Sequence, residues 1–412
     1  MKALRFLAIV LLSILSAFVL FILGCCMVLT PTYMGRYIFW NLSDIKDYER
    51  FPYHEVRNAP PTFYFGKNLQ EDNVRSALAT VEYQYNGTRQ KVGDLEGFLE
   101  SSGSTAYIVI KDDAILYEQY FNGYSRDSIN TSFSMAKSFA SALIGIAIDE
   151  GHIESVNDPV VRYIPELRGK GLDAVTIRDL LMMSSAIKYS ESKLPGDIDF
   201  PWGSDPLTYY HPDLRKTALA VKPDEPPGTH FHYNNYHPLL LGMILERTTK
   251  KSVAAYLQEK IWEPLGMEYP ASWSTDSEES GFEKMESGIN ARSIDFAKMG
   301  RLFLNNGNWN GQQIISEEWI EESTTRDTGT PPDYYSLPGW WVPYFKSGRG
   351  YYKYMWWGYS RNDTDYDFIA NGHLGQFIYV SPSKNLIIVR NGKTTGKIDS
   401  WPELLYNMAD RL

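Results

Sequence analysis

Strand-like segments lie at both ends of the body of this chain, and helix-like segments fill the middle. The apolar runs Ala106–Ile110 and Ala114–Tyr120 predict a first β-hairpin, and Gln376–Val380 with Asn385–Arg390 predict a second. Between them, residues from about 152 to about 300 follow helix and loop patterns. We therefore predict an α+β fold. One antiparallel sheet, flanked by helices, would be assembled from both ends of the chain, with a mostly helical domain inserted between them.

The N-terminal residues 1–30 have the composition of a membrane segment. An apolar run from Phe6 to Leu23 follows the basic residues Lys2 and Arg5 and approaches the roughly 20 residues that cross a bilayer. This pattern favours an uncleaved signal anchor, a transmembrane helix with its basic end in the cytoplasm. The Ile-Leu-Gly-Cys sequence at 22–25 loosely resembles a lipobox, so a lipoprotein signal is the alternative. Both place the rest of the chain on the extracytoplasmic side, periplasmic or extracellular.

The remaining sequence divides into two parts. Residues 31–95 suggest a loosely packed connector and N-terminal extension, with a stiff break at Asn58–Pro61. Regular apolar strand and helix patterns begin after this segment, and we predict one catalytic domain over 96–412. The only cysteines, Cys25 and Cys26, lie outside this domain, which excludes a cysteine nucleophile, a cysteine-ligated zinc and a disulfide scaffold there. The formal net charge of -10, without a basic stripe, argues against nucleic acid as a partner.

A strongly apolar helix is predicted from Ser134 to Glu150, directly after the first hairpin. Its first turn carries Ser134 and Lys137, and their i and i+3 spacing puts both side chains on one face. A lysine amine that is desolvated there loses proton affinity and can act as a base toward the serine hydroxyl. The same Ser-x-x-Lys spacing recurs where a capping serine and a surface lysine are the simpler interpretation. These other copies begin at Ser43, Ser185, Ser190 and Ser381.

Two further short motifs could complete such a site. Tyr233-Asn234-Asn235 precedes an apolar helix, and a tyrosine close to a lysine can pass a proton to a leaving group. His373-Leu374-Gly375 opens the strand that starts at Gln376, so it would face the start of the Ser134 helix. Taken alone, each motif is also explained by a structural side chain, since the chain holds 29 tyrosines and 7 histidines.

Two patterns point to other chemistry and are weaker. His230, His232 and His237 cluster as zinc ligands would, but no matching carboxylate motif accompanies them, and we predict no metal. Residues 393–396 (Lys-Thr-Thr-Gly) look like a Lys-Thr-Gly box with an extra residue. They follow the last strand and are better explained as a turn. The chemistry that the sequence suggests requires no organic cofactor.

In this order, the three motifs resemble those of the β-lactamase-like and penicillin-binding-protein-type serine hydrolases. The similarity is greatest to the branch of class C-related esterases, amidases and 6-aminohexanoate-dimer hydrolases, and it runs from about residue 95 to the C-terminus. The resemblance implies a β-lactamase-like fold for the catalytic domain. Short segments outside the three motifs show the same family similarity: Asn157–Val160, Tyr163–Glu166, Thr176–Leu181, Pro264–Met267, Ser293–Ala297 and Gly372–Pro382.

The resemblance also implies a role for each residue of the first two motifs. Ser134 would form an acyl-enzyme, and Lys137 would share its proton. Tyr233 would act as acid and base in acylation and deacylation. Asn235 would hydrogen-bond the lysine and the substrate.

The third motif would line the substrate side of the site, and here the chain departs from the antibiotic-binding members. The backbone N–H of Gln376 would complete an oxyanion hole with that of the serine, next to Gly375. His373 stands where many relatives carry lysine. Leu374 replaces the hydroxyl residue that helps those relatives to bind a substrate carboxylate, which disfavours β-lactam turnover and D,D-peptidase activity.

The predicted function is hydrolysis of a small-molecule ester or amide by a membrane-tethered serine hydrolase. A penicillin-binding D,D-peptidase or a β-lactamase is the enzymatic alternative. A non-catalytic binding or sensor protein on the same fold is the alternative from another class. The ring-rich stretch Tyr334–Trp357 would form a wall or lid for an apolar or extended acyl group, or would pack against the sheet.

Overall fold

The structure is a computed structural model, and it describes residues 2–40, 42–190, 193–194, 198–326, 332–337, 339 and 341–412. Its strands are β1 (Tyr53–Val56), β2 (Gly66–Lys67), β3 (Glu82–Tyr85), β4 (Thr88–Lys91), β5 (Ser104–Lys111), β6 (Ala114–Tyr120), β7 (Asn130–Thr131), β8 (Lys193–Leu194), β9 (Ile198–Asp199), β10 (Ala271–Ser274), β11 (Ile289–Ala291), β12 (Asn308–Trp309), β13 (Gln312–Gln313), β14 (Gly350–Lys353), β15 (Trp356–Ser360), β16 (Tyr366–Gly372), β17 (Gln376–Ser381) and β18 (Leu386–Gly392). Its α-helices are α1 (Lys2–Leu29), α2 (Pro31–Trp40), α3 (Glu71–Ala79), α4 (Leu95–Ser101), α5 (Met135–Asp149), α6 (Ile177–Leu181), α7 (Ser204–Tyr210), α8 (Leu214–Leu219), α9 (Tyr236–Thr249), α10 (Val253–Leu257), α11 (Ser293–Leu304), α12 (Glu317–Thr324), α13 (Val342–Lys346) and α14 (Trp401–Arg411).

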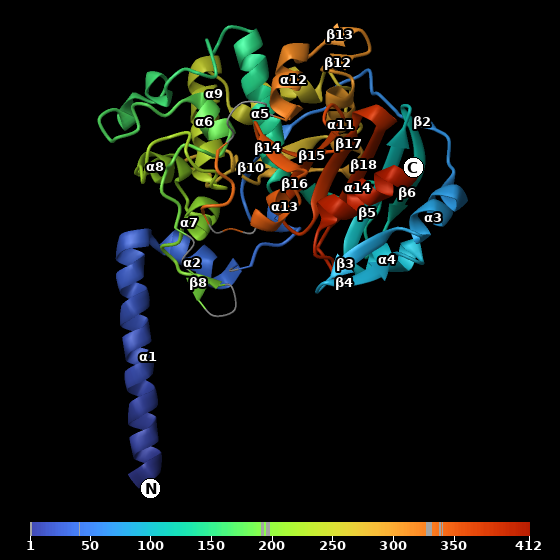
Figure 1. The fold of residues 1–412 in the computed structure, drawn as a ribbon. Helices are drawn as coiled ribbons and strands as arrows, with labels where there is room; N and C mark the ends of the chain where they lie inside the picture. The colour runs from blue at the N-terminus through green and yellow to red at the C-terminus, as the bar shows by residue number, and fades with distance from the viewer. Residues whose placement is uncertain are drawn as a thin grey trace.

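The largest sheet joins the two ends of the sequence, as predicted. Its strand order is β14-β15-β16-β17-β18-β5-β6-β2. The two predicted hairpins are β5–β6 and β17–β18, and they lie side by side because β18 pairs antiparallel with β5 (Figure 1). Only the short edge strand β2, among the described strands of this sheet, runs parallel to its neighbour. The α+β prediction and the predicted sheet are therefore confirmed.

Successive residues of a strand point to opposite faces of the sheet, and helices cover both faces. On β17, the Phe377 ring lies 6.0 Å from the Trp401 ring of α14. The next residue, Ile378, faces α11, where a Cβ on Gly300 would lie 3.0 Å from its side chain. The glycine thus lets the α11 backbone approach the sheet closely. This close approach packs α11, which follows β11, against β17, the strand that follows the third motif.

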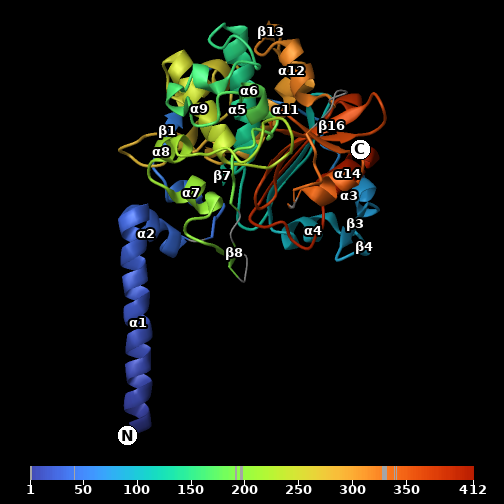
Figure 2. The same ribbon diagram turned by 60° about the vertical axis from the view of Figure 1, so that its left-hand side comes forward.

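The predicted helix from Ser134 to Glu150 is α5, which begins one residue later and ends one residue earlier than expected. Its side chains from Met135 to Ala147 are all buried, so it is a central core helix. It packs against α9 and against β16. In the interval predicted to be helical, α9 packs against α5, and α6, α8 and α10 each contact α9. Figure 2 shows α6, α8 and α9 grouped with α5 on one side of the molecule.

Residues 31–95 are more closely packed than the connector that the sequence suggests. Strand β1 pairs with β10 in a four-stranded sheet of order β1-β10-β11-β7. Strand β2 extends the large sheet, and Val74 and Leu78 of α3 belong to the main core. This packing could not be predicted from the sequence, because the strands are short and pair with residues far along the chain.

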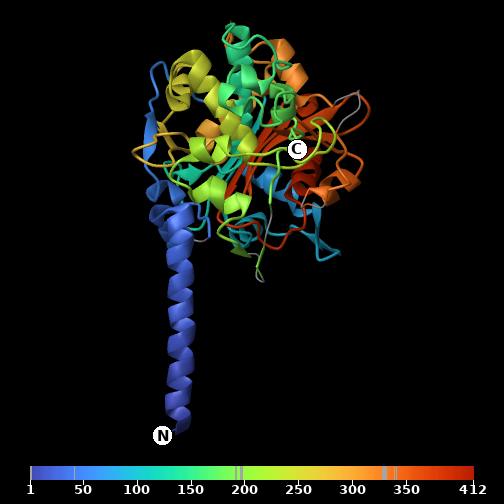
Figure 3. The same cartoon turned by 90° about the vertical axis from the view of Figure 1, so that its left-hand side faces the viewer.

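Helix α1 extends away from the folded body as a straight rod (Figures 1 and 3). Its segment Arg5–Leu29 has 25 residues, and an 18-residue window within it has a mean hydropathy of 3.1 and no residue buried within the protein. By length and composition it is the one described helix that could cross a membrane. Such a helix near an N-terminus is also what a signal sequence looks like.

Candidate active site

The nucleophile candidate lies where a strand turns into the central helix. Strand β7 ends at Thr131, and Ser132 N–H donates to the Ile289 carbonyl at 2.7 Å. Phe133 then adopts a positive φ of 44°, which is uncommon for a bulky side chain. Ser134 follows at the N-cap position of α5. A residue in a costly backbone conformation directly before a serine at a helix start is typical of a functional turn.

Lys137 lies one helical turn further and is in contact with the serine. Its Nζ is 2.9 Å from Ser134 Oγ and donates to the Glu286 backbone carbonyl at 3.0 Å. The side chain is buried, and burial lowers the pKa of this ammonium to about 7, while the negative charges of Glu286 and Asp205 oppose the shift. A large share of the lysine is therefore uncharged near neutral pH, as a base for the serine requires.

Tyr233 reaches the same serine from the loop before α9. Its hydroxyl is hydrogen-bonded to the Ser134 side chain, and its ring lies 4.9 Å from Lys137 Nζ. Burial raises the pKa of this phenol, the serine hydrogen bond lowers it and the charge of Asp205 raises it, with a net rise. Tyr233 therefore stays protonated and can donate. The structure brings together the serine, the lysine and the tyrosine that the sequence predicted.

The third motif forms the β16–β17 hairpin and lies beside the nucleophile turn. The His373 ring packs edge-on against the Phe133 ring, 5.5 Å between centroids. Burial lowers the pKa of this histidine, against an opposing effect of Asp205. Leu374 and Gly375 both have positive φ, 61° and 82°. At Gly375 a Cβ would lie 2.0 Å from Nη1 of Arg390 on β18, so only glycine fits the tip of the hairpin.

Gln376 is held firmly by its side chain. Its Nε2 donates to the carbonyls of His373 and Gly392 at 3.1 and 2.5 Å, and its Oε1 accepts from Asn391 Nδ2 at 2.9 Å. These bonds fix the hairpin end against β18. The expected part of its backbone N–H in an oxyanion hole stays a prediction.

Asn235 differs from expectation. Its Nδ2 donates to the Tyr189 hydroxyl at 2.9 Å and to Asp205 Oδ1 at 3.2 Å rather than contacting Lys137. The lysine donates instead to Ser134 and to the Glu286 carbonyl. The physical reason is the carboxylate of α7, which attracts the amide N–H groups and turns them away from the lysine.

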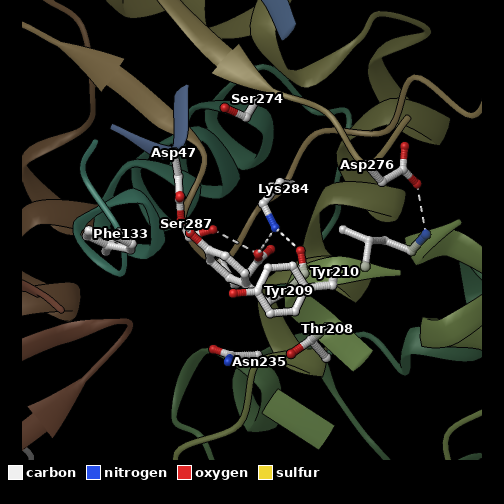
Figure 4. A network of polar contacts seen from close by, with 12 residues as sticks. Asp47, Phe133, Thr208, Tyr209, Tyr210, Asn235, Ser274, Asp276, Lys284 and Ser287 are labelled. Carbon is white, nitrogen blue, oxygen red and sulfur yellow. Dashed lines mark hydrogen bonds and ion pairs between the residues drawn. The ribbon is translucent and has the colours of Figure 1, made fainter. Parts of the chain in front are cut away.

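A buried ion pair beside the lysine was not predicted. Lys284 Nζ lies 3.0 Å from Glu286 Oε1 and donates to the Tyr209 carbonyl at 2.5 Å. Figure 4 shows Lys284 pointing toward Tyr209, whose ring lies 3.9 Å from Nζ, and Tyr209 in turn hydrogen-bonds Asp47. The sequence held no usable signal, since Glu286 lies 149 positions from Lys137 and its own stretch has no recognisable motif.

The ring-rich stretch Tyr334–Trp357 is mostly packed into the core, which favours the packing interpretation. Trp341, Phe345, Tyr354 and Trp356 are all buried. Trp340, within this stretch, lies outside the described residues. Two members also reach the site, since the rings of Tyr352 and Trp357 lie 6.3 and 5.6 Å from the Tyr233 ring.

The three histidines of the sequence cluster have separate partners. His230 Nδ1 pairs with Glu225 at 2.8 Å, and buried His237 Nε2 lies 2.5 Å from Ser185 Oγ. His232 packs between rings, 5.8 Å from that of Tyr189. Within the described part of the chain, no group of three or more His, Cys, Asp or Glu side chains could hold a metal ion.

Comparison with known proteins identifies the family of this chain. A family model described as Beta-lactamase matches residues 95–412, well over half of the chain. The chain belongs to the beta-lactamase family. Among curated relatives, this beta-lactamase-family chain is 26% identical over 333 residues to the 6-aminohexanoate-dimer hydrolase of Paenarthrobacter ureafaciens, covering 76% of each protein. It is 25% identical over 224 residues to the teichoic acid D-alanine hydrolase of Staphylococcus aureus, spanning about half the length of each, 52%.

Solved structures give the same family fold. A Bacillus anthracis protein provisionally described as a 6-aminohexanoate-dimer hydrolase aligns with a TM-score of 0.70 at 25% identity, covering 90% of this chain and 92% of that one. A family VIII carboxylesterase aligns with a TM-score of 0.57 at 17% identity, covering 84% of this chain and 98% of that one. This second likeness concerns the fold alone. The family and its named neighbours are hydrolases built on the serine β-lactamase fold, as the sequence resemblance predicted.

Proposed function

We propose that this beta-lactamase-family chain hydrolyses an ester or amide through an acyl-enzyme on Ser134. The single observation that carries the proposal is the 2.9 Å contact of Ser134 Oγ with the buried Lys137 Nζ. A lysine with a pKa near 7 can accept a proton from the serine at neutral pH, which a surface lysine cannot do efficiently. The placement of Tyr233 on the same oxygen supports it.

Acylation begins when Ser134 Oγ attacks the substrate carbonyl and passes its proton to Lys137. The backbone N–H groups of Ser134 and Gln376 stabilise the oxyanion that forms. As the carbonyl–leaving group bond breaks, Tyr233 gives its proton to the leaving group and takes one back from the lysine ammonium. A water molecule then attacks the acyl-enzyme and gives a proton to the lysine–tyrosine pair. That proton returns to Ser134 as the acid is released.

An activity-based probe tests this proposal without knowledge of the substrate. The full chain in detergent is treated with a fluorophosphonate and its intact mass is compared with that of Ser134→Ala. One adduct on the wild type and none on the variant is the expected result. No adduct on folded wild type would overturn the mechanism and favour a binding or sensor protein on this fold. Labelling by a fluorescent penicillin without ester cleavage would favour a D,D-peptidase or β-lactamase instead.

We also propose that α1 tethers the protein to a membrane with the catalytic domain on the extracytoplasmic side. An apolar helix of 25 residues is about 37 Å long, enough to cross the ~30 Å hydrocarbon core. Lys2 and Arg5 at its free end support a cytoplasmic N-terminus. Extraction from membranes by detergent but not by carbonate, with digestion of the body by externally added protease, is expected. An N-terminal mass showing a lipid on Cys25 would select the lipoprotein form.

A further inference from the structure

The outer face of α2 is apolar although it points away from the protein. Ile38 and Phe39 in its last turn are exposed, Phe39 by 83% of its surface, and Leu42 just beyond the helix is exposed by 75%. The opposite face is apolar too, since Tyr33 and Met34 are buried against the body. A helix that lies on a protein in water normally turns polar side chains outward. A second apolar face therefore indicates a neighbour other than water.

Another exposed aromatic side chain lies between α2 and α1. Trp202 precedes α7, is 48% exposed, and meets the Phe21 ring of α1 edge-on at 6.4 Å between centroids. The neighbouring Pro201 carbonyl accepts a hydrogen bond from the Tyr33 hydroxyl of α2 at 2.5 Å. In Figures 1 and 2, α2 lies at the end of the body from which α1 extends. Four exposed side chains form what we call the α1-proximal surface: Ile38, Phe39, Leu42 and Trp202.

An apolar hollow separates Trp202 from the end of α1. Its volume is about 330 Å³, and it is lined by Phe21, Gly24, Cys25, Val28, Leu29 and Trp202. These side chains are apolar or, in the case of the cysteine, behave as a small apolar group. Water gains little from such walls, whereas a hydrocarbon chain would bury apolar surface against them.

The position of these residues along α1 identifies lipid as the neighbour. The helix rises about 1.5 Å per residue, so Phe21 lies about 24 Å beyond Arg5. The hydrocarbon core of a bilayer is about 30 Å thick, so a span that begins near Arg5 places Phe21, with the Trp202 ring on it, just inside the outer boundary. Tryptophan is enriched at this depth in membrane proteins. The last two turns of α1 also pack against the buried cluster that contains Tyr33, which holds the body at this height.

We propose that the α1-proximal surface lies in the outer headgroup region of the bilayer, with Phe39 and Trp202 in contact with lipid. This inference rests on the proposed membrane tether. It adds that the catalytic body docks on the membrane instead of standing off it on a free stalk. The exposed apolar side chains bury area in the bilayer boundary, as those of amphipathic surface helices do. Docking also holds α7, which begins at Ser204 directly after this surface, close to the lipid.

The test measures lipid contact at single positions of the full chain. The only cysteines are replaced by Cys25→Ala and Cys26→Ala. Phe39→Cys or Trp202→Cys then carries an NBD fluorophore in nanodiscs of phosphatidylcholine and phosphatidylglycerol. A lipid with a nitroxide near the headgroup end of its acyl chain quenches fluorophores close to it. Docked side chains lie about 5–10 Å into this boundary, so both probes should be quenched at least about twofold more than a probe remote from the membrane.

Tyr64→Cys is the matched control for these probes. Tyr64 is also a large exposed aromatic side chain, with 67% of its surface accessible. It follows Phe63, whose ring lies 4.8 Å from that of Trp309 in β12. In Figure 1, β12 lies at the end of the body opposite α1. The control probe should therefore remain unquenched in the same nanodiscs.

The outcomes separate docking from tethering and from catalysis. If the protein co-elutes with nanodiscs but the probe at Phe39 or at Trp202 is quenched no more than the one at Tyr64, docking is overturned and the tether stands. Failure to enter nanodiscs, or a wild-type mass that shows cleavage before Cys25, would refute a tether by α1 and this inference with it. The fluorophosphonate adduct on Ser134 is measured separately, so neither result decides the proposed hydrolase mechanism.

Discussion

The buried Glu286 carboxylate provides a direct test of how the candidate site adjusts the proton affinity of Lys137. The Glu286 backbone carbonyl accepts from Lys137 Nζ at 3.0 Å, and the side chain of the same residue pairs with Lys284. Its negative charge raises the pKa of Lys137 against the larger lowering effect of burial. Glu286→Gln removes this charge but keeps the side-chain shape and the backbone contact. We expect the pKa of Lys137 to fall in the variant.

The size of the shift follows from Coulomb's law. For two unit charges about 6 Å apart at an effective dielectric constant of about 20, it gives about 3 kcal/mol, or about two pKa units. Lys284 cancels much of this effect in the wild type, so we expect a net shift of about 0.5–1 unit. A base must be uncharged to act, so activity is present above the lysine pKa and is lost as the pH falls through it. The variant should therefore keep its activity to lower pH.

The assay is the rate of fluorophosphonate labelling of Ser134 between about pH 5 and about pH 9, which needs no known substrate. The acidic limb of the wild type should be centred near pH 7, the pKa of Lys137, and that of Glu286→Gln should lie lower. Glu278→Gln serves as the control, because Glu278 is exposed and is not among the charges that act on the lysine. An unmoved limb, a limb moved upward, or an equal shift in the control would refute the reasoning.

Three further substitutions test the site and its support. Lys137→Met should abolish labelling. It should nevertheless raise the free energy of unfolding at pH 7 by about 2–4 kcal/mol, because the lowered pKa of the buried lysine costs stability. Urea unfolding at several pH values measures this gain, which should vanish above about pH 10.5. Tyr233→Phe should keep the fold, seen by circular dichroism, and lower ester turnover about 10²–10⁴-fold. Gly375→Ala should lower the free energy of unfolding by about 2–4 kcal/mol, because its φ is positive and its Cβ would clash with Arg390. Gly348→Ala, at a φ of 72° with open space around it, should cost only about 1 kcal/mol. Thermal unfolding of both variants measures the difference.

The sequence predicted those parts of the site that local pattern encodes. The Ser134 helix start, with its i+3 lysine, is a local feature, and so is the hairpin that carries His373. Tyr233 could be placed because a short motif precedes a strongly apolar helix. The structure brings Ser134, Lys137 and Tyr233 into contact and sets His373 beside them, so local pattern and family resemblance were enough for this core of the site.

Contacts between distant residues could not be predicted in the same way. Asp205 lies 30 positions from Asn235, and nothing in the composition of α7 shows that its carboxylate would capture that amide. The pairing of Lys284 with Glu286 looks like an ordinary surface pattern of alternating charges. Only burial, at 2% exposure for both side chains, turns it into part of the site. Burial depends on the whole fold, which is why the assigned role of Asn235 was wrong in its partner.

The segment that follows the apolar helix is in contact with the surroundings of the candidate site. Arg36 of α2 donates to the Asp276 carbonyl at 2.6 Å, and the Phe51 ring lies 4.4 Å from Lys284 Nζ. Lys284 pairs with Glu286, whose backbone contacts Lys137. Arg36 also lies over the Phe51 ring, at 5.2 Å, so a continuous set of contacts joins α2, which follows α1, to Lys137. Because a buried ion pair is sensitive to the loss of any partner, we expect a change at Phe51 that disturbs the Lys284–Glu286 pair to alter the proton affinity of Lys137 as well.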